Sequence, residues 1–257
     1  MRRHTLLDDI LRPGGLSILF QPILEVVSGE QVLFALEALA RGPKGSNVEC
    51  ANVLFEYVRR KGRETDVDRA CITRAIAAAA GVPGEPAISI NVHASTVERD
   101  RNFCDFLIEI CSGHGVHVSR LILEIVEQQK FWDERAFFAA LGRLRDLGVR
   151  IALDDIGIGY SNHRMLIEVR PDLFKIDRYF IHGCSENHYS RAAIESIALL
   201  ADRLGGRVVA EGIETLADFE TVSALGIDLV QGYYFAHPSV APSGGIPSTQ
   251  HDASATH

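Results

Sequence analysis

The stretch SILFQPILEVVSGEQVLFALEALAR, residues 17–41, consists of two long apolar runs separated only by Ser28-Gly29-Glu30. So short a connection has no room for a helix. The two runs are therefore predicted to be antiparallel strands joined by a hairpin turn at Ser28-Gly29-Glu30. This start departs from a regular barrel, in which every strand is parallel to the next.

The rest of the chain alternates between strand-like and helical patterns. Six apolar runs follow the hairpin: AISINV (87–92), LILEIVE (121–127), VRIALDDI (149–156), DLFKID (172–177), RVVAEGI (207–213) and DLVQGYYF (228–235). Helical patterns cover 51–61, 66–80, 103–112, 134–147, 190–204 and 216–225. Eight strands with helices between them predict an α/β fold, a modified (β/α)8 TIM-type barrel with an antiparallel first strand.

The ends of the chain differ from its middle. Residues 1–15 are predicted to be an amphipathic lead-in ending at Pro13-Gly14-Gly15, and residues 16–238 to be the barrel. Residues 239–257 are rich in Ser, Pro, Gly, Ala and His, a composition that predicts a disordered tail.

Composition limits the class of protein. The chain has 257 residues and is 47 % hydrophobic, enough for one large core. Its net charge of −8 disfavours a protein that holds long nucleic acid. No apolar run is long enough to span a membrane. Five cysteines without a Cys-x-x-Cys pair indicate reduced thiols, so we expect a cytoplasmic location.

Ionisable or amide side chains lie within or just after seven of the eight apolar runs. They are Glu37, Asn91, Glu124, Asp154-Asp155, Lys175, Glu211 and Gln231. Each alone could be a turn residue, a helix cap or a group on a wet face. In a barrel, however, the carboxyl ends of the strands converge on one mouth. Five carboxylates buried together need more positive charge than one lysine supplies, which predicts bound cations.

The expected ligands are carboxylate and amide oxygens, which suit hard ions such as Mg²⁺ or Mn²⁺ better than zinc. Adjacent aspartates, Asp154 and Asp155, could reach two ions. Two such ions can activate a water and stabilise the leaving oxygen of a phosphate ester. From the residues alone we therefore predict a two-metal phosphoester hydrolase, without its substrate.

The same segments resemble the motifs of the EAL family of cyclic di-GMP phosphodiesterases. Glu37-Ala38-Leu39 is similar to the family's signature tripeptide, within the pattern Glu-x-Leu-x-Arg that ends at Arg41. The segments QPI, SINVHAS, LEIVE, LDDIGIGYSN, FKID, VAEGIET and QGYYFAHP resemble the family's other motifs in order. The resemblance extends from about Ser17 to Pro238 and implies hydrolysis of cyclic di-GMP to linear pGpG with two Mg²⁺ or Mn²⁺ ions.

The resemblance also implies a role for each matching position. Glu37, Asn91, Glu124 and Asp154 would hold one metal, and Asp154 and Asp155 the second. Lys175 would lie beside the attacking water, Glu211 would be the general base or a second-metal ligand, and Gln231 would position water or metal. Gln21, Leu39 and Arg41 would meet the substrate, while Glu127 would brace the loop after the aspartates. EAL domains also pair, which implies a homodimer through Asn162–Glu168.

Two departures from the family pattern leave alternatives open. Ile156 and Ile158 replace the usual Phe and Thr after the aspartates, and VLFEYVRRKGRETDVDRA replaces the FIPLAE segment. A catalytically weak domain that acts as a cyclic di-GMP receptor or protein-interaction module is the main alternative, and an unrelated metal-dependent barrel lyase is another. The basic cluster Arg59-Arg60-Lys61 with Arg63 is either a solvated helix end or a patch that guides an anionic substrate.

Overall fold

The computed structural model describes residues 4–126, 133–156 and 163–240, without the side chains of Asp155, His163 and Arg164. Eight strands form a closed barrel in the order in which they occur in the chain. They are β1 (Ser17–Val27), β2 (Glu30–Arg41), β3 (Ala87–His93), β4 (Leu121–Val126), β5 (Arg150–Ile156), β6 (Leu173–Ile176), β7 (Arg207–Ala210) and β8 (Leu229–Val230). The predicted fold class is confirmed.

The hairpin that the sequence predicted is present. β1 pairs with β2 in antiparallel register, with Gln21 opposite Glu37, and the turn places both Ser28 and Gly29 at positive φ, 54° and 87°. Two consecutive residues at positive φ make the tight turn whose twist suits a hairpin. β1 also pairs antiparallel with β8, through Leu24 and Val230, and this pairing closes the barrel.

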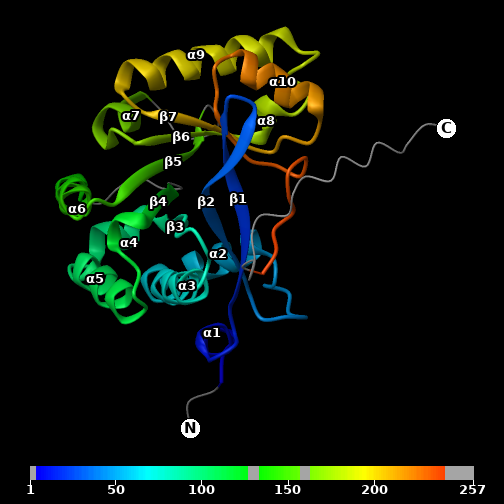
Figure 1. The fold of residues 1–257 in the computed structure, drawn as a ribbon. Helices are drawn as coiled ribbons and strands as arrows, with labels where there is room; N and C mark the ends of the chain where they lie inside the picture. The colour runs from blue at the N-terminus through cyan, green and yellow to red at the C-terminus, as the bar shows by residue number, and fades with distance from the viewer. Residues whose placement is uncertain (1–3, 127–132, 157–162, 241–257) are drawn as a thin grey trace.

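The helices surround the barrel, as Figure 1 shows. They are α1 (Leu6–Leu11), α2 (Ala51–Arg60), α3 (Glu64–Ala79), α4 (Ala94–Arg99), α5 (Phe103–Gly113), α6 (Glu134–Asp146), α7 (His163–Val169), α8 (Arg178–Ile181), α9 (His188–Leu204) and α10 (Leu216–Ala224), with a 3-10 turn at Val118–Arg120. The six predicted helices correspond to α2, α3, α5, α6, α9 and α10. The short α1, α4, α7 and α8 were not predicted, because four to seven residues are too few for a clear helical period.

Apolar side chains fill both the inside and the outside of the barrel. Inside, one residue from each strand contributes to a compact cluster: Ile23, Ala35, Ala87, Ile122, Ala152, Leu173, Val209 and Leu229. A larger cluster lies between strands and helices. The inner cluster fills the interior of the barrel, and the polar side chains near the carboxyl ends of the strands lie at its mouth.

The two ends of the described chain pack against the barrel. Thr5 caps α1 with a capping box, and Ile10 of α1 is fully buried in a cluster with residues of α2 and α3. After β8 the chain returns to β1, where Ser239 and Phe20 exchange two backbone hydrogen bonds. The predicted tail beyond residue 240 lies outside the described residues. None of the helices in the described ranges combines the length and apolar character needed to cross a bilayer.

Candidate active site

The polar residues predicted at the strand ends meet at one mouth of the barrel. Glu37 lies opposite Ser89 in the β2–β3 pair, and Asn91 lies opposite Glu124 in the β3–β4 pair. Lys175 lies in β6, and Glu211 and Gln231 directly follow β7 and β8. Glu124 is fully buried, and Lys175 is 2 % exposed. Burial of charged groups to this degree requires that they compensate one another.

Lys175 is the centre of this cluster. Its ammonium group forms ion pairs with Glu124 and Glu211. Its Nζ also lies 3.5 Å from Glu37 Oε1 and 3.7 Å from Asp154 Oδ1. One cation therefore faces four carboxylates that come from four different strand ends. The sequence placed these residues at the mouth but did not show that the lysine would lie among them.

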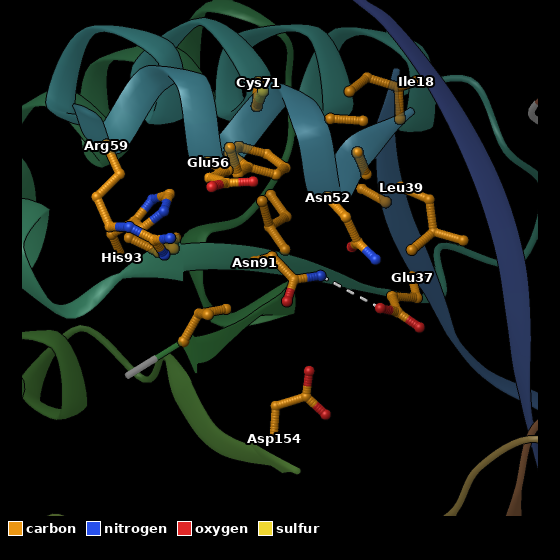
Figure 2. Close-up of a pocket in the computed structure, with 17 residues that line it drawn as sticks. Ile18, Glu37, Leu39, Asn52, Glu56, Arg59, Cys71, Asn91, His93 and Asp154 are labelled. Carbon is orange, nitrogen blue, oxygen red and sulfur yellow. Dashed lines mark hydrogen bonds between the residues drawn. The ribbon is translucent and has the colours of Figure 1, made fainter. Parts of the chain in front are cut away.

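Hydrogen bonds fix the orientation of Glu37. Asn91 Nδ2 donates to Glu37 Oε1 at 3.2 Å, and Gln231 Nε2 donates to Glu37 Oε2 at 2.6 Å (Figure 2 shows the first). Gln231 Nε2 also lies 3.2 Å from Gln21 Oε1, while Gln21 Nε2 donates to the carbonyl of Ala236 at 3.0 Å. Both carboxylate oxygens of Glu37 are thus held, which limits its rotamers.

The cluster separates the proton affinities of its carboxylates. Burial and the nearby Glu37 charge raise the pKa of Glu124 to about 8, although Lys175 opposes the shift. Burial likewise raises the pKa of Glu211 well above its usual range. Burial would raise the pKa of Glu37 too, but the Lys175 charge and the two amide donors outweigh it and lower that pKa. The neighbouring carboxylates hold the pKa of Lys175 well above its usual value despite burial.

The donor set fits a hard divalent cation in its chemistry. Carboxylate and amide oxygens converge. Glu211 Oε1 is buried and pairs with Lys175, whereas Gln231 Oε1 is buried without a hydrogen bond from the described residues. Buried oxygens without donors are groups that a cation can satisfy. Within the described residues, however, no three His, Cys, Asp or Glu side chains are grouped closely enough to hold an ion as they stand. Lys175 supplies the positive charge instead.

Some predicted residues lie outside the described part of the chain. These are Glu127, the segment 157–162 with Ile158, and the side chain of Asp155. Ile156, at the end of β5, is described and buried, and it pairs with Ile176 of β6. The first replaced position of the loop is therefore part of the barrel core.

Two pockets open from the cluster. The larger, of about 400 Å³, lies between α2 and the ends of β2 and β3, and Glu37, Asn91 and Asp154 line it (Figure 2). The smaller, of about 230 Å³, is lined by Gln21, Glu211 and Gln231 among others. Glu37 and Leu39 line both. The carboxylates therefore lie between the two pockets. A ligand longer than the carboxylate cluster could extend from one pocket into the other.

Of the three residues predicted to meet substrate, Gln21 and Leu39 line these pockets. Arg41 lines neither, and its Nη1 donates to the carbonyl of Ala40 at 2.9 Å. The contact of Arg41 with substrate stays a prediction.

The sequence missed two supports of the site. Ser89 Oγ donates to Glu124 Oε1 at 2.5 Å, and its spacing of two residues from Asn91 on one strand could have indicated that it faces the mouth. Asp68 of α3 accepts from the backbone N–H and Nδ1 of His93 and from Thr96 Oγ1. No sequence signal linked Asp68 to residues 25 or more positions away.

Comparison with known proteins places the chain in a family. A model of the EAL domain matches residues 4–238. Cyclic di-GMP phosphodiesterase PA2567 of Pseudomonas aeruginosa is 36 % identical over 151 residues, 59 % of this chain and 26 % of that protein. Oxygen sensor protein DosP of Escherichia coli is 28 % identical over 247 residues, 94 % of this chain and 30 % of that protein. The chain thus spans less than a third of either relative.

Solved structures agree with this result. A standalone EAL protein from Vibrio cholerae with bound cyclic di-GMP aligns with a TM-score of 0.77 at 26 % identity, covering 87 % of this chain and 92 % of that one. BlrP1 of Klebsiella pneumoniae, in a complex with calcium and cyclic di-GMP, aligns with a TM-score of 0.78 at 26 % identity, covering 89 % and 57 %. The family model covers nearly all of the described structure, and the chain belongs to the EAL domain family.

Proposed function

We propose that this chain is a phosphodiesterase that hydrolyses cyclic di-GMP to linear pGpG with two Mg²⁺ or Mn²⁺ ions. The observation that carries the proposal is the convergence of Glu37, Glu124, Asp154 and Glu211 around Lys175 at the carboxyl mouth of an EAL barrel. The names of PA2567 and of the cyclic di-GMP complexes support this substrate.

The proposed metal ligands are the oxygen donors of the mouth. Glu37, Asn91, Glu124 and Asp154 would hold one ion, and Asp154 with Asp155 the other. Bound there, the ions would supply a nucleophilic water at neutral pH and stabilise charge on the phosphate. The manganese and calcium complexes of BlrP1 support a divalent ion in such a site.

The remaining residues act on substrate and protons. Lys175 can donate to a phosphate oxygen or to the attacking water, since its ammonium group stays charged among carboxylates. Glu211 is able to take or hold a proton because burial raises its pKa. Gln231 and Asn91 orient Glu37, and Gln21, Leu39 and Arg41 would contact the substrate. Glu127, which is outside the described residues, would brace the loop after the aspartates.

Product analysis tests the proposal. The purified chain should convert cyclic di-GMP to pGpG with Mg²⁺ or Mn²⁺, and EDTA should stop the reaction. Glu37→Ala and Asp154→Ala should lose both turnover and bound metal, whereas Lys175→Ala should lose turnover with less effect on metal content. Binding of cyclic di-GMP without turnover in either metal, at neutral and alkaline pH, would contradict the proposal.

One observation favours the receptor alternative. Lys175 already pairs with Glu124 and Glu211, and the described acids are not grouped for an ion. The receptor alternative would bind the dinucleotide without cleaving it, and the product assay separates the two functions. We also propose a cytoplasmic location for this chain. The five free cysteines support that location.

A further inference from the structure

The four basic residues at the end of α2, Arg59, Arg60, Lys61 and Arg63, have different surroundings in the structure. Arg60 forms an ion pair with Glu56 one helical turn before it, and Arg63 pairs with Asp66. Lys61 lies over the ring of Tyr57, 5.6 Å from its centroid. Arg59 alone among these four lines the larger pocket. Three of the four basic groups therefore behave as a solvated helix end, and one does not.

The side chain of Arg59 has no ion pair or hydrogen bond with any residue in the described ranges of the chain. Its side chain is only partly exposed and, with His93, lies at one end of the pocket, while Glu37 lies at the other (Figure 2). A guanidinium group that is partly withdrawn from water and unpaired interacts strongly with an anion that enters its pocket.

The wall beside Arg59 is fixed in place. His93 Nδ1 lies 3.0 Å from Asp68 Oδ1, and Thr96 Oγ1 donates to the same carboxylate at 2.6 Å. The ring of Phe55 packs edge-on against His93, with centroids 5.5 Å apart. A ligand that reaches Arg59 therefore meets a preformed surface and loses little affinity to ordering of the protein.

A cyclic dinucleotide needs a second cation in this pocket. It carries two phosphates, and only one can be cleaved at the carboxylate cluster. The other must lie some way off from that cluster, where a further cation would pair with its charge. Arg41 donates to a backbone carbonyl and lines neither pocket, and Arg178, which lines the smaller pocket, pairs with Glu214. Arg59 is therefore the arginine placed to meet the second phosphate in the larger pocket.

We propose that Arg59 binds the phosphate that is not cleaved, so that the α2 wall of the larger pocket is a second anion subsite of the substrate. The inference rests on the proposed function. The pocket of about 400 Å³ is within the range of small-ligand sites. Guanidinium groups fork onto phosphate oxygens with two parallel hydrogen bonds, which a lysine at the same place would not reproduce.

The test uses two ligands that differ in one charge: pGpG, and a pGpG analogue whose internal phosphodiester is an uncharged methylphosphonate. Binding is measured by calorimetry with Mg²⁺ for the unchanged chain, Arg59→Ala, Arg59→Lys and the control Arg60→Ala. The unchanged chain and Arg60→Ala should bind pGpG at least tenfold more tightly than the analogue. Arg59→Ala should bind both alike, and Arg59→Lys should recover part of the preference.

Turnover gives a second readout. Arg59→Ala should raise KM for cyclic di-GMP at least tenfold with little change in kcat, and should leave hydrolysis of bis(p-nitrophenyl) phosphate unchanged, because that compound has a single phosphate. Equal losses for pGpG and its analogue would assign Arg59 to the base or ribose and overturn the proposal, as would equal behaviour of Arg59→Ala and Arg60→Ala. If the unchanged chain neither binds nor cleaves cyclic di-GMP, the proposed function fails and the subsite with it.

Discussion

At the scale of single residues, the distinctive feature is the ammonium group of Lys175. It lies among the carboxylates that would bind metal in the proposed reaction. Lys175 is 2 % exposed and pairs with Glu124, which is fully buried, and with Glu211. In the proposed reaction the same side chain would have two tasks, to neutralise the mouth before metal binds and to act on the substrate afterwards. This double role gives a prediction about stability that does not depend on turnover.

We expect Lys175→Met to destabilise the metal-free chain by about 3–5 kcal/mol, because removal of one partner leaves buried carboxylates uncompensated. The measurement is urea unfolding in EDTA. Mg²⁺ should restore part of the loss, since an ion that binds only the folded state stabilises it. Lys44→Met, at an exposed position, is the control. A Lys175→Met chain as stable as the unchanged one in EDTA would show that the lysine does not neutralise the cluster.

At the scale of elements, one carboxylate joins α10 to the connection between α8 and α9. Asp218 in the first turn of α10 accepts hydrogen bonds from the backbone N–H groups of Gly183 and Ser185 and from Thr215 Oγ1, at 3.2, 3.1 and 2.9 Å. Burial would raise the pKa of Asp218, but these donors outweigh it and lower that pKa below its usual value. The folded state therefore favours the ionised form.

A lowered pKa in the folded state means that the stabilisation is complete above the usual carboxyl pKa and is lost as pH falls through the folded value. Asp218→Asn should lower the free energy of unfolding at pH 7 by about 1–3 kcal/mol. The difference from the unchanged chain should shrink below about pH 4. Asp202→Asn, on the exposed face of α9, serves as the control. A difference that stays constant down to pH 2 would refute this origin of the effect.

The hairpin turn gives a second prediction at this scale. Gly29 has φ of 87°, and an added Cβ would meet nothing within 4 Å, so a substitution there costs backbone strain alone. Gly29→Ala should lower stability by about 1–2 kcal/mol. Gly113→Ala, where φ is ordinary and the space is also open, should be neutral or slightly stabilising. Thermal unfolding of both variants measures the contrast, and equal effects would contradict it.

Because the turn lies at the end of the hairpin away from Glu37, turnover of the folded Gly29→Ala chain should be unchanged. A loss of turnover without a loss of stability would indicate that the turn communicates with the mouth.

At the scale of the whole molecule, the homodimer through Asn162–Glu168 is still a prediction. In its described part, Met165 and Leu166 of α7 are buried, while Ile167 is 62 % exposed. An exposed isoleucine on the predicted interface gives a direct test. Ile167→Glu should convert a dimer into a monomer in sedimentation at micromolar concentration. Leu199→Glu on α9, where the leucine is 57 % exposed, should not. A fully active monomer of the unchanged chain would refute the dimer.

Local features of the sequence determined the architecture. The short connection at Ser28-Gly29-Glu30 allows only a hairpin, and alternating strand and helix periods specify the barrel. The polar residues at the strand ends could be placed at one mouth for the same reason, since parallel strands bring their carboxyl ends together. The helix and strand runs that the sequence identified are long enough to show their own period, whereas the four short helices are not.

Only the tertiary structure decided which side chains meet. Gln231 holds Glu37 from 194 positions away, and Lys175 reaches Glu124 from 51 positions away. Such contacts depend on the register of strands around a closed barrel and on the rotamers that packing permits, and no local pattern encodes either. Arg59 illustrates the same limit: the sequence shows a basic helix end, but the orientation of α2 against the barrel turns this one arginine into the pocket and leaves Arg60 in water.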